Sequence, residues 1–259
     1  MPALQEQTCL QSIDQLTEDI FRLTLTAPQI ARKAKPGQFV MVKTTAGFDP
    51  LLRRPFSIHD RPDKETIVLL FKAIGKGTML LGAIQAGQAV DLVGPMGNNF
   101  HYNGNKRYCL IGGGMGIAPL LFLARQLQEY ENVPPSILLG AQTAEELHPL
   151  IGDFNVLGCN PQVSTDDGSL GHCGYVSELL PPLLTEVDEV CVCGPTPLMA
   201  KVAQLCAVAA IPCQSSLETH MACGLGACLG CTVHGHDATY LHVCKHGPVF
   251  DATQIQWVR

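Results

Sequence analysis

The chain has 259 residues, enough for two compact domains and a small third one. With 46% hydrophobic and 15% charged residues, its composition is that of an ordinary globular protein. The formal net charge of −6 gives no reason to expect nucleic-acid binding, which requires a basic surface.

The N-terminal stretch MPALQEQTCLQSIDQLTEDIF has no basic region followed by an apolar core, so it predicts no signal peptide. The longest uncharged stretch, 108–124, is too short for a bilayer span and is interrupted by glycines and a proline. We therefore expect a soluble, cytoplasmic protein with no membrane span. Its 12 cysteines should then be reduced, and clustered ones point to metal rather than to disulfides.

The first third of the chain is rich in short strands. Segments 20–27, 38–44 and 65–73 carry strand-like residues, with turn signals between them. This spacing predicts a small antiparallel β-barrel, which we assign to a first domain of residues 1–102.

Two motifs in this domain suggest a flavin nucleotide. In RRPFSIHD, Arg54 can bind a phosphate while Ser57 presents a hydroxyl to a flavin ring. Further on, Gly75, Gly77 and Thr78 precede a short helical stretch, and free amides at a helix start suit a pyrophosphate. The first motif alone could be a strand with a buried arginine, but the two together favour a flavin.

From residue 106 the pattern alternates between strands and helices. Strands are predicted at 106–113, 136–140 and 189–193, and helical segments at 117–130, near Glu145, at 176–180 and at 197–210. The alternation predicts a doubly wound parallel sheet of the Rossmann-like α/β class, assigned to residues 103–212.

Two turns of this domain could bind a dinucleotide. CLIGGGMGIAPLL places a glycine-rich turn between a strand and a helix, although it is not a strict G-x-G-x-x-G and such turns are often structural. VCVCGPTPLMAKV places a thiol and a turn where another strand ends, at the sheet edge where α/β domains bind ligands. The second strand is followed by no clear acidic residue, only by Glu145 and Glu146 beyond the turn.

The remaining residues, 213–259, form a cysteine-rich tail. Cys223, Cys228 and Cys231 have the spacing C-x4-C-x2-C, which with one distant cysteine is the plant-type 2Fe-2S pattern. We choose Cys244 as the fourth ligand, with Cys213 as the rival. Zinc is the alternative metal, although it prefers paired C-x2-C knuckles. A Rieske centre would need histidine in place of two cysteines, and we expect the neighbouring histidines to be solvated.

Taken in order, Arg-Pro-x-Ser, Gly-x-Gly-Thr, the glycine turn and Cys-Gly-Pro resemble the ferredoxin–NADP reductase superfamily over residues 5–210. With SLETHMACGLGACLGC and VCKHGPVFDA added, the whole chain resembles the electron transfer subunits of class 1B dihydroorotate dehydrogenases, which carry FAD and a 2Fe-2S cluster.

The resemblance implies a role for each matching residue. The expected FAD contacts are Arg54, Pro55, Phe56, Ser57, Leu70, Phe71, Lys72, Gly77 and Thr78. The expected nicotinamide site consists of Gly113, Gly114, Cys193, Gly194 and Pro195. The expected cluster ligands are Cys223, Cys228, Cys231 and Cys244. Gln142 stands where relatives tend to have an arginine, so the preference between NAD(H) and NADP(H) stays open.

The family further implies an FMN-containing dihydroorotate dehydrogenase catalytic subunit as partner in a heterotetramer of pyrimidine biosynthesis. No activated base or nucleophile stands out in this chain, so we assign no catalytic residue and expect an NAD-linked electron relay. Two alternatives remain: a reductase of the same fold serving another acceptor, such as a sulfide- or hydrogen-linked complex, and a non-catalytic module with a structural zinc tail.

Overall fold

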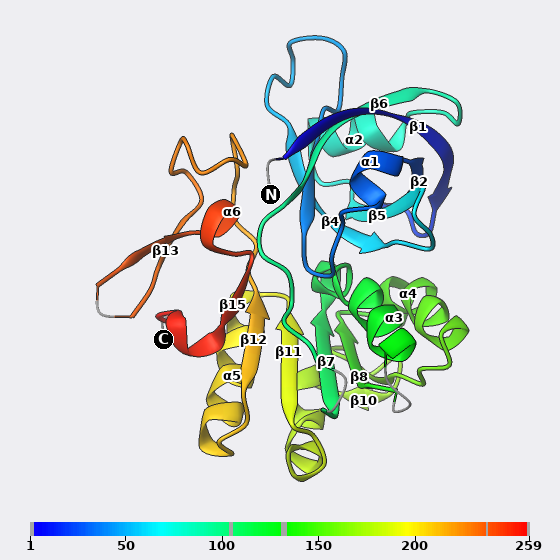
Figure 1. Cartoon of the computed structure of the whole chain (residues 1–259). Helices are drawn as coiled ribbons and strands as arrows, with labels where there is room; N and C mark the ends of the chain where they lie inside the picture. Colours follow the sequence, from blue (N-terminus) through cyan, green and yellow to red (C-terminus); the bar gives the residue numbers. More distant parts are fainter. Residues whose placement is uncertain (1–2, 104–105, 131–133, 237, 258–259) are drawn as a thin grey trace.

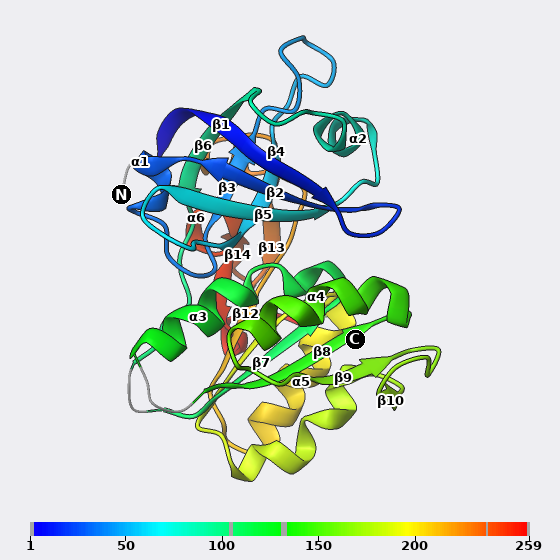
Figure 2. The same cartoon turned by 90° about the vertical axis from the view of Figure 1, so that its right-hand side faces the viewer.

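The computed structural model describes residues 3–103, 106–130, 134–236 and 238–257. Within them a β-barrel lies against one end of an α/β sheet, and the C-terminal segment runs beside both (Figures 1 and 2). No helix among the described residues is long and apolar enough to cross a membrane.

The barrel consists of six antiparallel strands in the closed order β1-β2-β5-β4-β3-β6. Their bounds are β1 Leu4–Gln15, β2 Ile20–Thr26, β3 Phe39–Val42, β4 Arg54–Asp60, β5 Thr66–Lys72 and β6 Ala89–Met96. Two short helices, α1 (Pro28–Ala31) and α2 (Lys76–Gly82), lie in its connections. The barrel predicted from the sequence is thus confirmed.

The longest barrel strand, β1, is not apparent in the sequence because two of its buried positions are polar. Glu6 is 5% exposed, and its carboxylate accepts hydrogen bonds from the amides of Gln29 and Ile30 at 3.0 and 2.9 Å. These amides begin α1 and have no partner inside the helix. The buried Thr8 hydroxyl donates to the carbonyl of Val90 at 2.8 Å. The inward face of β1 therefore stabilises its neighbours through polar contacts and lacks a regular apolar period.

The second half of the chain forms a seven-stranded sheet in the order β10-β9-β8-β7-β11-β12-β15. The strands are β7 Tyr108–Gly113, β8 Ser136–Ala141, β9 Gln162–Thr165, β10 His172–Cys173, β11 Glu189–Cys193, β12 Cys213–Ser216 and β15 Val249–Asp251. All neighbours are parallel except β12 and β15, which are antiparallel. The predicted Rossmann-like sheet is confirmed.

Helices cover both faces of this sheet (Figure 1). They are α3 Leu120–Tyr130, α4 Ala144–Val156 and α5 Thr196–Val208, with 3-10 turns η1 Gly114–Ile117, η2 Val176–Leu179 and η3 Pro181–Thr185. Cys109 and Ile111 of β7 belong to the core under α5, whereas Leu110 belongs to the core under α3 and α4. Burial on both faces explains why β7 reads as one continuous apolar run.

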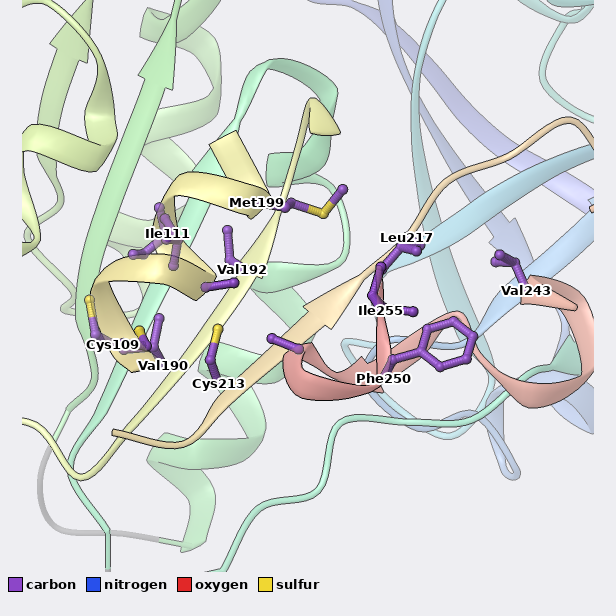
Figure 3. Packing of buried hydrophobic residues seen from close by; sticks show 14 of the residues in the cluster. Cys109, Ile111, Val190, Val192, Met199, Cys213, Leu217, Val243, Phe250 and Ile255 are labelled. Carbon is purple, nitrogen blue, oxygen red and sulfur yellow. The ribbon is translucent and has the colours of Figure 1, made fainter. Parts of the chain in front are cut away.

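The cysteine-rich tail is continuous with this sheet. Between β12 and β15 run the loop Cys223–Cys231, which we call the cysteine loop, the hairpin β13 (Thr232–His234) and β14 (Tyr240–His242), and α6 (Val243–His246). The 3-10 turn η4 (Ala252–Gln254) follows β15. Figure 3 shows Leu217, Phe250 and Ile255 lying between the sheet and Val243 of α6, in one shared core. The division expected after residue 212 therefore crosses a continuous sheet, and the boundaries 1–102, 103–212 and 213–259 stay predictions.

Ion pairs tie the barrel to the helices of the sheet. Asp60, at the end of β4, accepts hydrogen bonds from Nε and Nη2 of Arg125 in α3 at 2.8 and 2.6 Å. Arg22 of β2 pairs with Asp153 of α4 at 2.7 Å. These contacts hold the barrel against α3 and α4.

Candidate functional site

A cleft of about 270 Å³ opens between the barrel, the turn after β7 and the segment after β12. Among the residues expected to contact FAD, those that line it are Arg54, Pro55, Phe56, Ser57, Leu70, Phe71, Lys72 and Thr78. They converge because β4 and β5 are antiparallel neighbours in the barrel. Phe56 and Phe71 lie with ring centroids 5.3 Å apart, which gives the cleft an aromatic wall suited to a planar ring system.

One end of the cleft has the features of a phosphate site. Gly77 lies beside it, where a Cβ would come 3.2 Å from Arg54 Nε and 3.3 Å from Thr44 Oγ1. The Thr44 hydroxyl is buried and has no hydrogen-bond partner within the described residues. A guanidinium, an unpartnered hydroxyl and a backbone without a side chain fit the pyrophosphate of FAD.

The opposite wall was not apparent in the sequence. It is formed by Ser216–Thr219 and Met221, together with Met115 and Ala118 from the turn after β7. The Thr219 hydroxyl is buried without a partner among the described residues, a second polar group available to a ligand. The signal that could have located this wall is SLETHM, which stands directly before the cysteines.

Besides Arg54, two charged side chains lie at the cleft. Lys72 Nζ pairs with Glu146 of α4 at 2.7 Å and with Asp19 at 3.2 Å, and chiefly the hydrogen bond that Lys72 donates to Glu146 raises the pKa of Lys72. Glu218 is open to the cleft, yet the surrounding protein desolvates its carboxyl and raises the pKa of Glu218. Lys72 thus links the barrel to α4, and Glu218 holds its proton more tightly than an ordinary glutamate.

The two turns expected to bind nicotinamide lie side by side. They follow β7 and β11, which are parallel neighbours, at the carboxyl edge of the sheet. A Cβ on Gly113 would come 3.4 Å from Pro195 Cδ, and one on Gly194 would come 3.1 Å from the Gly113 carbonyl oxygen. Gly194 has φ +153° and Gly114 has φ +54°, which favour glycine at both positions.

The thiol of Cys193, between these turns, is fully buried. Desolvation and, to a lesser extent, the charge of Glu218 raise the pKa of Cys193 well above its ordinary value. Cys193 therefore contributes a neutral thiol beneath the turn. The assignment of Gly113, Gly114 and Cys193–Pro195 to nicotinamide stays a prediction.

Acidic residues lie beside the end of β8, although no clear acidic residue directly follows this strand in the sequence. The amides of Asp166 and Asp167, which follow β9, donate to the carbonyls of Ala141 and Gln142 at 3.1 and 3.2 Å. Both side chains are exposed. They were missed because the pairing of β8 with β9, and not the order along the chain, brings them beside Gln142.

The four cysteines expected to hold the cluster lie as two pairs. The thiols of Cys231 and Cys244 are 3.3 Å apart and buried. Cys223 lies beside Cys228, whose amide donates to the Cys223 sulfur at 3.4 Å. No three His, Cys, Asp or Glu side chains in the described residues form a group that could hold a single metal ion. Two thiol pairs, however, fit a binuclear cluster with four cysteine ligands.

Backbone amides of the cysteine loop point at the sulfurs. Leu225 donates to Cys223 at 3.3 Å, and Gly226 donates to Cys244 at 3.1 Å. Desolvation raises the pKa of Cys223, but the amides of Cys228, Leu225 and Ala227 outweigh it and lower this pKa to about 6. A sulfur held partly as thiolate is prepared for metal binding.

The rival cysteine and two of the neighbouring histidines have other partners. Cys213 lies in β12, where its thiol contacts Cys206 of α5. His242 Nδ1 lies 3.0 Å from the Thr232 hydroxyl, and His246 Nδ1 accepts from the amide of His242. This geometry supports Cys244 over Cys213, and the ligand set stays a prediction.

Two family models match the chain. Residues 7–102 match the oxidoreductase FAD-binding domain, and residues 218–256 match the iron-sulfur cluster binding domain of dihydroorotate dehydrogenase B. These matches confirm the FAD domain and favour an iron–sulfur cluster over zinc in the tail.

Curated relatives are similar over almost the whole chain. A protein of Geobacillus kaustophilus named dihydroorotate dehydrogenase B (NAD(+)), electron transfer subunit, is 37% identical over 257 residues, 97% of this chain and 98% of the relative. One of the same name from Desulforamulus reducens is 38% identical over 245 residues, 92% of each chain. Among solved structures, the NADH-dependent reduced ferredoxin-NADP oxidoreductase matches with a TM-score of 0.85 and 28% identity, covering 97% of this chain and 90% of that one.

Proposed function

The chain belongs to the family of dihydroorotate dehydrogenase B electron transfer subunits, and we propose that it passes electrons between an FMN-containing dihydroorotate dehydrogenase subunit and NAD+ in pyrimidine biosynthesis. The main observation in support of this proposal is the position of one short segment between the flavin cleft and the cysteines. Ser216–Thr219 and Met221 line the flavin cleft, and Cys223 follows Met221 two residues later. The cleft and the cysteine loop are therefore adjacent along the chain as well as in space.

A bound flavin exchanges hydride with nicotinamide and single electrons with an iron–sulfur cluster, which is the conversion such a relay needs. The chain's own residues would hold and orient these groups. Arg54, Thr44 and Thr78 would bind the pyrophosphate, and Phe56 and Phe71 would exclude water from the ring. Oxidation of dihydroorotate would belong to the partner subunit.

For the dinucleotide we propose NAD(H). Gly114 has open space beside it at the carboxyl edge, where a nicotinamide nucleotide can approach closely, whereas Gly113 and Gly194 allow the two turns to pack against each other. The backbone amides of Asp166 and Asp167 bring these exposed residues to the turn at Gln142, where the Asp167 carboxylate accepts hydrogen bonds from Ser169. A carboxylate there can accept a hydrogen bond from a ribose hydroxyl and repels the 2′-phosphate of NADP(H).

Anaerobic titration of the purified chain tests the relay on its own. NADH should bleach the flavin absorption and then produce the electron paramagnetic resonance signal of a reduced 2Fe-2S cluster, and NADPH should do so far more slowly. A colourless protein that holds stoichiometric zinc and no iron would contradict the proposal.

The similarity to the NADH-dependent reduced ferredoxin-NADP oxidoreductase supports a second candidate, a relay of the same fold that serves another acceptor. The two candidates differ in the partner. Copurification with an FMN-containing subunit that oxidises dihydroorotate favours the first, and copurification with a different redox subunit favours the second.

A further inference from the structure

A second cleft, of about 400 Å³, lies between the barrel and the cysteine loop, apart from the flavin cleft. Its barrel wall includes Lys33 and Lys35, and its other wall includes Leu225, Cys244 and Lys245. We call it the lysine cleft. None of its lining residues is acidic.

The positive charge of the lysine cleft is uncompensated within the described residues. Lys33, Lys35 and Lys245 are exposed and form no ion pair there, whereas Lys72, Lys76 and Lys106 each pair with a carboxylate. The chain as a whole carries a net charge of −6. Three unpaired ammonium groups around one hollow of an acidic protein create a local attraction for anionic groups.

The walls of the lysine cleft are fixed to each other. Asn98 on the barrel side donates from its backbone amide to the carbonyl of Gly247 and from its side chain to the carbonyl of His246, both at 2.6 Å. On the other side, a Cβ on Gly224 would come 2.7 Å from Met41 Cγ, so the cysteine loop packs directly on β3. The cleft is thus preformed, which lowers the entropic cost of binding.

An apolar rim adjoins these charges. Leu225 and Leu229 of the cysteine loop are 62% and 53% exposed. The stem of Lys245 packs over this loop, since a Cβ on Gly226 would come 2.9 Å from Lys245 Cδ. Exposed leucines beside a charged hollow suit a protein surface, which can cover them, better than a small anion.

We propose that the lysine cleft binds an acidic segment of the FMN-containing catalytic subunit, whose apolar residues cover Leu225. This inference rests on the proposed function and specifies the chemistry of the partner's surface. Because Cys244 lines the cleft, a partner seated there lies against the proposed cluster ligands. Charge pairing at such a site sets the association rate and the orientation of the complex.

Binding of the full chain to its organism's own FMN-containing subunit tests the proposal. The dissociation constant is measured by sedimentation at low and high salt for the wild type, for Lys33→Glu/Lys35→Glu, and for the triple variant that adds Lys245→Glu. The double variant, which is remote from the cysteines, should weaken binding at low salt about tenfold or more, and high salt should reduce the difference.

The matched control is Lys43→Glu/Lys64→Glu/Lys201→Glu, which changes the net charge as much as the triple variant at exposed lysines outside the cleft. It should bind like the wild type. In the double variant and in the control, the flavin and iron contents and the reduction of flavin by NADH should stay unchanged.

Equal binding of wild type and double variant would overturn the docking proposal alone. So would saturable binding of inorganic phosphate that the double variant loses while the complex remains unaffected. If the wild type forms no complex with the FMN-containing subunit, the proposed function fails together with the docking.

Discussion

At the scale of single residues, Arg54 is the side chain on which flavin retention should depend most. Its guanidinium lies beside Gly77 and near the unpartnered Thr44 hydroxyl, where it would pair with a phosphate. We expect Arg54→Ala to weaken FAD binding by about 2 kcal/mol, roughly thirtyfold, because a charge-assisted hydrogen bond is lost. The flavin-to-protein ratio after gel filtration measures this.

Arg32→Ala is the control, since Arg32 is exposed and pairs with Glu65 on the barrel surface. It should keep its flavin. Unchanged FAD occupancy in Arg54→Ala would remove Arg54 from the site.

The thiol pairs lead to a second expectation at this scale. Cys228→Ala should abolish the cluster, because one of its four proposed ligands is gone, yet NADH should still reduce the flavin. Iron content and the spectrum of the reduced protein measure the two effects separately.

Cys213→Ala serves as the comparison, because this buried cysteine lies in β12 and contacts Cys206. It should retain the cluster. Loss of NADH-dependent flavin reduction in Cys228→Ala would mean that the order of the relay is wrong.

At the scale of elements, the contact between β6 and the tail depends on Gly97. Gly97 has φ +79°, and a Cβ there would overlap Pro248 and come 2.8 Å from the Gly247 carbonyl oxygen. Gly87 has a similar φ of +86° but open space around it. Gly97→Ala should therefore lower the free energy of unfolding by about 1–3 kcal/mol more than Gly87→Ala.

Denaturant midpoints of the two variants measure this difference, since the strain of a positive φ is common to both. Equal midpoints would show that the tail moves away from the barrel at no cost.

Whether a strand can be predicted from the sequence depends on whether its buried residues are apolar. Strands with one continuous or alternating apolar pattern, such as β5, β7 and β11, are predicted within a few residues of their observed bounds. β1 and β12 are not, because they bury Glu6 and Thr8 in one case and Gln214 and Ser215 in the other. Such residues are stabilised by partners distant in the sequence, which a local pattern does not contain.

At the scale of the whole molecule, the barrel and the sheet are held together by charge pairs. Asp60 has a side chain that is 7% exposed and forms two hydrogen bonds with Arg125. Asp60→Asn should destabilise the protein by about 1–3 kcal/mol, because the arginine charge loses its partner in a partly buried place. Denaturant unfolding followed by flavin fluorescence and circular dichroism measures it.

Asp14→Asn is the matched control, because Asp14 is exposed on β1. It should leave the free energy of unfolding within about 0.5 kcal/mol of the wild type. An Asp60→Asn protein as stable as this control would mean that the apolar contacts between barrel and sheet suffice.

Like the strands, the candidate functional sites could be predicted from the sequence only where their residues are contiguous. Short motifs located the barrel side of the flavin cleft and the cysteine loop, because their residues are contiguous. The opposite wall at Ser216–Thr219 and Met221 and the acidic pair Asp166 and Asp167 depend on strand pairing, which the motifs do not contain. The proposed preference for NAD(H) depends on Asp166 and Asp167, which lie beside the end of β8 because β8 and β9 are neighbouring strands.

The central claim is that this chain carries electrons between dihydroorotate oxidation and NAD+. The most direct measurement reconstitutes the chain with the FMN-containing subunit and follows NADH formation upon addition of dihydroorotate. We predict that NADH forms in step with orotate, and that omitting this chain stops NADH formation. Orotate formation by an intact complex without any reduction of NAD+ would contradict the account.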